Sequence, residues 1–220
     1  MGLVDFFSKI NRTAKDSKTA MVAGLEGLGL KVTSQKGAVS DLAGKYKERE
    51  VIMNIDASNV MGAGKAAMIG GAASALAGAV GLFPRGFQSW TEQDASYHAR
   101  DMMQRAQMLY RWAMLSRTAA PANVNISHNK KMGQEIAKKL YARADESVMA
   151  ILRKQEVLSA LQAAHFDEIS INEKNFKAFW APQMSEYQNV VASPAHFTQA
   201  VRNTLDALSI LCDQICGSGT

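Results

Sequence analysis

The sequence predicts an all-α protein of six to seven helices, arranged as a multi-helix bundle around a central Ala/Gly-rich helical hairpin. Three observations favour this fold class. Alanine, methionine, glutamine and lysine are common, and all four favour helices. Only four prolines interrupt the 220 residues. Apolar side chains recur every three or four residues in several long segments, as on one face of a helix. We expect three parts: residues 1–56, 57–117 and 118–220.

The first part begins with an expected helix from about Leu3 to Leu28. Its start combines an apolar face with basic residues, a pattern typical of helices that lie in a membrane interface, although a packed terminal helix has the same pattern. The candidate membrane contacts are Leu3, Phe6, Phe7, Ile10, Lys9 and Arg12. Residues 31–44 are expected to form a loop or short helix. Residues 50–56 fit a strand or a helix end, and we favour the helix.

The most unusual segment is Ala66–Pro84, which has no charged residue and consists mostly of alanine and glycine. About 20 residues suffice for a helix to span a bilayer, but each large aliphatic side chain favours insertion by only about 0.3–0.6 kcal/mol. Three interpretations of this segment therefore stay open: a buried central helix, a membrane-inserting helix and a Gly-rich loop. Small residues four apart allow close helix packing. The candidate packing or insertion residues are Ala67, Gly70, Gly71, Ser74, Ala75, Gly78 and Ala79.

A second helix of the hairpin is expected from Trp90 to about residue 117, because Ser89 and Glu92 have the spacing of a capping box. Its seam is rich in alanine and predicts close antiparallel contact. The seam residues are Ala95, Ala99, Met102, Ala106, Leu109 and Ala113.

The third part is expected to open with a loop at residues 118–127 and a long helix at residues 129–164. An extended piece is expected next, at residues 168–171. It is followed by a short helix that bears Phe176, Phe179 and Trp180, and these three aromatic residues are a candidate partner interface. The last helix has the clearest signals, since Ser193 and Pro194 suit its N-cap and first position. Its apolar stripe contains Phe197, Val201, Leu205, Leu208, Leu211 and Ile215.

Several kinds of chemistry are not expected. A phosphate-binding loop would need glycine in place of Asn59 and serine or threonine in place of Ala66. The four histidines are scattered, and Cys212 and Cys216 are expected to be reduced and partly buried. We therefore expect no catalytic site, no cofactor and no metal site.

The function expected from these features is a non-enzymatic helical assembly or adaptor protein, with a component of a bacterial secretion or delivery machine as one such role. The alternative is a membrane-active protein that forms a pore or translocates with the Ala66–Phe83 segment, and a third is an enzyme with an unrecognised site. Protein partners or self-association into an oligomer are expected. The net charge of +5 also allows a membrane surface, while nucleic acid is not an expected partner. The N-terminus lacks a signal-peptide pattern, so we expect a cytoplasmic location, with association with a membrane as an option.

Overall fold

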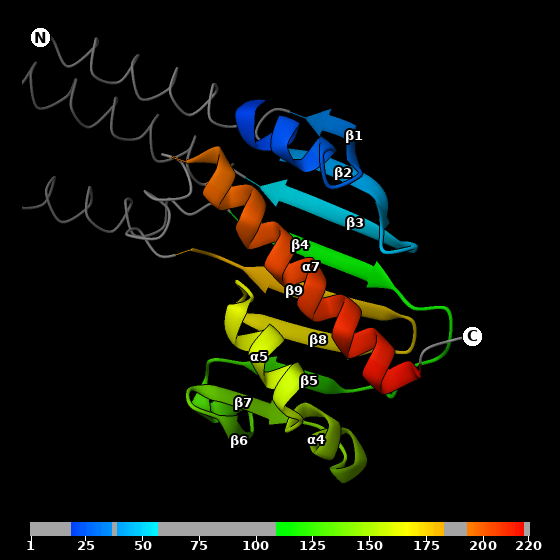
Figure 1. The fold of residues 1–220 in the computed structure, drawn as a ribbon, viewed down its shortest axis with the longest axis vertical. Coiled ribbons are helices and arrows are strands. Elements are labelled where there is room, and N and C mark those ends of the chain that lie inside the picture. Colours follow the sequence, from blue (N-terminus) through cyan, green and yellow to red (C-terminus); the bar gives the residue numbers. More distant parts are fainter. Residues whose placement is uncertain (1–18, 37–38, 57–108, 183–192, 218–220) are drawn as a thin grey trace, which may run out of the picture.

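Nine antiparallel strands form one sheet in the computed structural model, which describes residues 19–36, 39–56, 109–182 and 193–217 (Figure 1). The order across the sheet is β1-β2-β3-β4-β9-β8-β5-β7-β6. The strands are β1 (Leu30–Lys36), β2 (Val39–Tyr46), β3 (Arg49–Asp56), β4 (Leu109–Leu115), β5 (Val124–Ser127), β6 (Gln134–Ala137), β7 (Leu140–Arg143), β8 (Glu168–Asn172) and β9 (Asn175–Trp180). The predicted all-α bundle is therefore wrong, and strands of this sheet come from all three expected parts of the chain.

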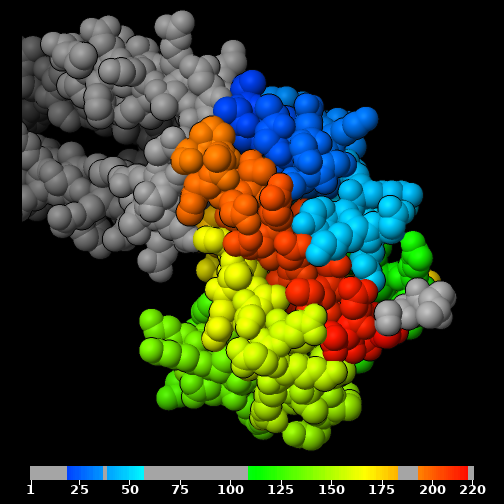
Figure 2. All heavy atoms as spheres, in the orientation of Figure 1, coloured from blue at the N-terminus to red at the C-terminus, as the bar shows by residue number. Residues whose placement is uncertain are grey.

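Helices cover one face of the sheet. The longest, α7 (Pro194–Cys216), crosses β4 and β9, and α5 (Gln155–Ala163) and α4 (Glu146–Leu152) pack beside it (Figure 1). Residues 19–26 are also helical, and a 3-10 turn, η1, spans Lys130–Met132. Figure 2 shows atoms of α7, α5 and α4 forming a continuous layer over this side of the molecule. No helix among the described residues has an apolar stretch long enough to cross a bilayer.

The core lies between this helical layer and the sheet. Along β4, Tyr110, Trp112 and Met114 are buried while Arg111 is exposed, which is the period-two alternation of a strand with one covered face. From α7, Phe197 is fully buried and its ring centroid lies 5.2 Å from that of Tyr110. The other core side chains of α7 are Ala200, Val201, Thr204, Leu205, Ala207, Leu208, Ser209, Leu211 and Cys212.

The prediction for the last helix is confirmed. Ser193 is its N-cap, and its hydroxyl accepts a hydrogen bond from the His196 amide at 3.3 Å. Pro194 occupies the first turn, and the predicted stripe is buried except for the half-buried Ile215. The extended piece at residues 168–171 is also confirmed, as part of β8. Of the helix expected from Leu3 to Leu28, the structure describes residues 19–28. Residues 19–26 are helical.

The other helices predicted within the described residues are corrected. Residues 31–36 belong to β1 and residues 39–44 belong to β2, so the expected loop or short helix is wrong there. Residues 50–56 belong to β3, so the favoured helix at that segment is wrong and the strand alternative is right. The expected helix from Trp90 fails where it is described, because residues 109–115 are β4. Residues 129–164 contain η1, β6, β7, α4 and α5 instead of one helix, and the expected loop at 118–127 includes β5. The short aromatic helix is β9. In each case pairing with a neighbouring strand overrides local helix propensity.

The start of the sheet requires two glycines. Gly29 has φ +82°, in the left-handed region that glycine adopts without steric cost. Its carbonyl oxygen approaches the backbone of Gly44 so closely that a Cβ atom built on Gly44 would lie 1.9 Å from it. Gly44 is the register partner of Leu30, the first residue of β1, so this close approach sets where β1 joins β2.

The end of β3, the start of β4 and the end of β9 lie together at one end of the sheet (Figure 1). Asp56, the last residue of β3, pairs with Leu109, the first residue of β4, so residues 57–108 connect two directly paired positions. The next residue, Tyr110, pairs with Trp180 at the end of β9. A Cβ atom on Gly24 would lie 2.2 Å from Thr198 Oγ1, which places the helix at 19–26 against the first turns of α7.

Two groups of predicted site residues lie outside the described residues. They are the small-residue group Ala67, Gly70, Gly71, Ser74, Ala75, Gly78 and Ala79, and the N-terminal group Leu3, Phe6, Phe7, Ile10, Lys9 and Arg12. Their roles stay predictions.

Candidate functional site

The face of the sheet opposite the helices, which we call the open face, carries side chains in aligned rows. Strand register places residues that are distant in sequence side by side. One row contains Asp41, Asn54, Arg111, Phe179 and Glu168, and the next contains Ala43, Ile52, Ala113, Lys177 and Ser170. Each row crosses five strands, from β2 through β3, β4 and β9 to β8, so the open face brings together segments that lie between residues 39 and 180 of the sequence.

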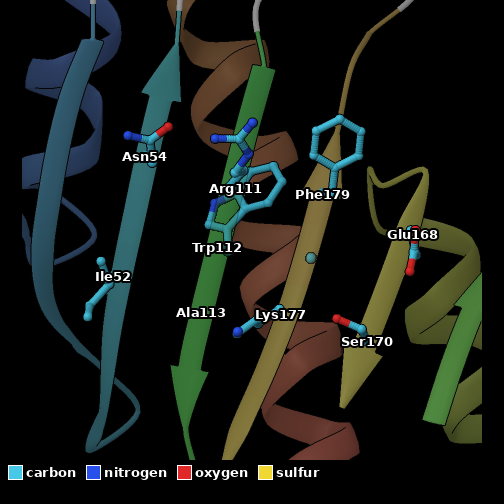
Figure 3. Close-up of a pocket in the computed structure, with 10 residues that line it drawn as sticks. Ile52, Asn54, Arg111, Trp112, Ala113, Glu168, Ser170, Lys177 and Phe179 are labelled. Atoms are coloured by element: carbon cyan, nitrogen blue, oxygen red, sulfur yellow. The ribbon is translucent and has the colours of Figure 1, made fainter. Parts of the chain in front are cut away.

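A hollow of about 360 Å³ lies at the centre of this face (Figure 3). Figure 3 shows the side chains of β3, β4, β9 and β8 around it, with α7 behind the strands. The lining residues are Ile52, Asn54, Arg111, Trp112, Ala113, Glu168, Ser170, Lys177, Ala178 and Phe179. The hollow is a shallow surface depression of mixed character, with apolar and charged groups close together.

The apolar part of the hollow comes from Ile52, Ala113 and Phe179. Ile52 is 52% exposed, although its neighbours Val51 and Met53 are buried. A large aliphatic side chain that is exposed within a hollow gains the most from being covered by a partner.

The charged part consists of two cations and one carboxylate. Arg111 and Lys177 lie on adjacent strands, in neighbouring rows, and Glu168 lies on β8. Within the described part of the chain, none of these three groups forms an ion pair; the pairs there are Lys47–Asp206, Arg49–Asp213 and Arg153–Glu146. The hollow therefore offers a net positive charge that these residues leave uncompensated.

Asn54 is held in place at the edge of the hollow. Its amide nitrogen donates to Asp41 Oδ1 at 2.7 Å, and this bond spans β3 and β2 within the same row. Asn54 Oδ1 is shielded from solvent and accepts no hydrogen bond from the described residues. The amide is thus a fixed polar wall beside the apolar centre.

The predicted aromatic interface is divided between the two faces of the sheet. Because β9 is a strand, Phe176 and Trp180 point into the core and are almost fully buried, while Phe179 lies on the open face. Trp180 packs against Tyr110, with ring centroids 5.2 Å apart. Of the three predicted residues, only Phe179 is available to line the hollow.

The remaining open-face residues were missed because they acquire significance only once the strands are paired. Ile52 gave the one usable signal, since it interrupts the alternation of Val51, Met53 and Ile55. Arg111 and Lys177 read as ordinary surface charges, because nothing local places them on adjacent strands.

A polar cluster lies on the opposite side, where the β2–β3 turn meets α7. Tyr46 Oη donates to Asp206 Oδ1 at 2.9 Å, and Lys47 Nζ lies 2.7 Å from the same oxygen. Arg49 donates to Cys212 Sγ at 3.3 Å, to Ser209 Oγ at 3.4 Å and to Asp213. These contacts attach the turn to the second half of the helix.

Burial and the hydrogen bond to Asp206 raise the pKa of Tyr46 from 10.0 to about 12. The folded state therefore keeps this proton between pH 10 and about 12, where the unfolded state loses it, so the free energy of unfolding should fall as pH rises through that range. We expect Tyr46→Phe to lose less stability there than the wild type, as measured by urea unfolding across the range. Parallel curves for the two proteins would contradict this expectation.

No set of three or more histidine, cysteine, aspartate or glutamate side chains in the part of the chain that the structure describes is arranged to hold a metal ion. The hollow on the open face brings exposed apolar and charged side chains together around one depression.

Comparison with protein family models, curated proteins and solved structures found no match to this chain.

Proposed function

We propose that this chain is a non-enzymatic adaptor protein whose open face binds a partner protein through an apolar side chain flanked by an acidic group. The observation that carries the proposal is the hollow, where the exposed Ile52 and Phe179 lie beside Arg111 and Lys177. An apolar centre with a polar rim is the usual anatomy of a protein–protein contact.

The size of the hollow favours a short peptide segment or loop of the partner. A volume of about 360 Å³ is at the lower end of the range of small-molecule pockets. The hollow is a depression on a sheet rather than an enclosed cavity, so it suits a side chain presented by a larger molecule (Figure 3).

The charges favour an acidic partner. Arg111 and Lys177 have no ionic partner among the described residues, whereas Glu168 stands at one side of the hollow. A carboxylate seated between the two cations would gain attraction from both, and its approach would be steered at low salt. Arg111 also offers the planar fork that binds carboxylates in a bidentate manner.

The proposal is tested by selecting displayed random peptides on the wild-type protein and counter-selecting on Arg111→Glu/Lys177→Glu. We expect the selected peptides to share an acidic residue beside a large apolar one. In calorimetry, the double variant should bind the best peptide at least about tenfold more weakly, a loss of ~1.4 kcal/mol, because two attractions become repulsions. Affinity should also fall with added salt.

The matched control is Arg153→Glu/Arg202→Glu, which makes the same change in charge at exposed positions of the helical layer. It should bind the peptide as the wild type does. Selected peptides that lack acidic residues, or that bind all three proteins equally, would show that the open face is not the binding surface.

A further inference from the structure

The two cysteines of the chain lie on one face of α7, in its last two turns. Residues four apart on a helix are neighbours, and the Cys212 thiol interacts with that of Cys216. Both sulfurs are free; Cys212 is buried and Cys216 is half-buried. They line a hollow of about 200 Å³ whose other walls come from the β2–β3 turn and from the segment after β4.

Cationic groups dominate the walls of this hollow. Lys47, Arg49 and Arg117 line it, with Glu48 as the carboxylate among its lining residues. Lys47 is paired with Asp206 and Arg49 with Asp213, while Arg117 has no ionic partner among the described residues.

Arg49 is fixed directly against one thiol. Its Nε donates to Cys212 Sγ at 3.3 Å, and its other nitrogens are held by Ser209 and Asp213. A ligand that replaces the thiol proton would thus find a hydrogen-bond donor already placed to stabilise the sulfur as a thiolate.

The ligand set selects against metals that need four ligands. Structural zinc takes four nitrogen, sulfur or oxygen ligands, and no third histidine, cysteine, aspartate or glutamate completes such a set within the described residues. A soft d10 cation such as Cu(I) prefers thiolate sulfur and is satisfied by two of them.

The charge balance also favours a monovalent ion. Two thiolates with one Cu(I) carry a net charge of −1, and Arg117, which has no ionic partner among the described residues, lines the same hollow and would compensate it. The last turn of α7 contains no basic residue of its own, so this compensating charge comes from the segment after β4.

We propose that Cys212 and Cys216 form a two-coordinate thiolate site for a soft monovalent cation, with Cu(I) as the ion that fits. Each thiol gives up its proton to solvent as its sulfur binds the ion, and no change of oxidation state is involved. Arg49 is a positioning residue that donates to one sulfur. This site is separate from the open face and does not depend on the function proposed for it.

The test is an oxygen-free titration of the reduced full chain with Cu(I) alone, in competition with a coloured Cu(I) chelator. The wild type should withdraw one equivalent of Cu(I) from the chelator, and Cys212→Ser/Cys216→Ser should bind at least a hundredfold more weakly. The double variant retains all methionines and histidines, so it controls for their binding. Equal withdrawal by both proteins, or none by the wild type, would overturn the proposal.

A second measurement uses only the wild type and so does not depend on the folding of a variant. Iodoacetamide alkylation is followed at each cysteine by mass spectrometry, with and without one equivalent of Cu(I). We expect Cu(I) to protect both cysteines together, and the same concentration of Zn²⁺ to protect neither. Protection of one cysteine alone, or equal protection by Zn²⁺, would contradict a two-coordinate site.

Discussion

Replacing Phe197 with alanine is expected to lower the free energy of unfolding by about 3–5 kcal/mol, the usual range for removing a buried aromatic ring. Phe197 is fully buried where α7 crosses the sheet, and its ring packs against Tyr110. Its loss removes buried apolar area and leaves a cavity that two regular elements cannot close. Because a domain is stable by only about 5–15 kcal/mol, urea unfolding should show a large shift of the midpoint.

Phe179→Ala is the matched control. The same residue type stands there on β9, half-buried on the open face rather than in the core. Its truncation should cost no more than about 1 kcal/mol, as for substitutions outside the core, while weakening the binding of an acidic peptide. Equal destabilisation by the two substitutions would mean that both faces of the sheet are covered.

Gly44→Ala is expected to destabilise the protein by about 1–3 kcal/mol or more, the cost of forcing extra atoms into a packed region. The added Cβ atom would meet the Gly29 carbonyl oxygen at 1.9 Å, and that oxygen belongs to the backbone. A flexible side chain could move aside, but here β1 itself must shift away from β2. Thermal unfolding measures the loss, and faster amide exchange in β1 would locate it.

Gly27→Ala provides the comparison, because its Cβ atom would lie 3.4 Å from its nearest neighbour, the Gly24 carbonyl oxygen. We expect a change of less than about 0.5 kcal/mol, as at ordinary surface positions. If Gly44→Ala were as mild as Gly27→Ala, the close approach of Gly29 and Gly44 would not set the start of the sheet.

Some elements could be predicted because their signals are local. The start of α7 is encoded by Ser193 and Pro194, and its face by apolar residues at helical spacing. The extended piece at 168–171 was recognisable from a short alternating run, which is β8. In both cases the residues that specify the element lie within it.

The sheet could not be predicted in the same way, because helix-favouring composition hides strands whose stability comes from pairing. Between residues 129 and 164 the apolar spacing fits one helix, yet β6 and β7 form a hairpin there, with Lys139 in its turn at φ +67°. The first α-helix in this stretch begins after Asp145. Alanine and lysine have only a weak intrinsic preference for the helical conformation, and tertiary contacts override it here.

The open face was still less accessible to sequence analysis. The side chains that lie next to each other on this face are register partners from different strands. Examples are Arg111 on β4 with Phe179 on β9, and Ile52 on β3 with Ala113 on β4. Register depends on the whole buried face and on the turns, so it is information that no single segment contains.

The direct pairing of Asp56 with Leu109 has a consequence for how the chain tolerates change. The entropy lost on closing a connection grows only with the logarithm of its length, so that doubling it costs about 0.6 kcal/mol. A change in the number of residues between Asp56 and Leu109 should therefore add little to the entropic cost of bringing these two positions together.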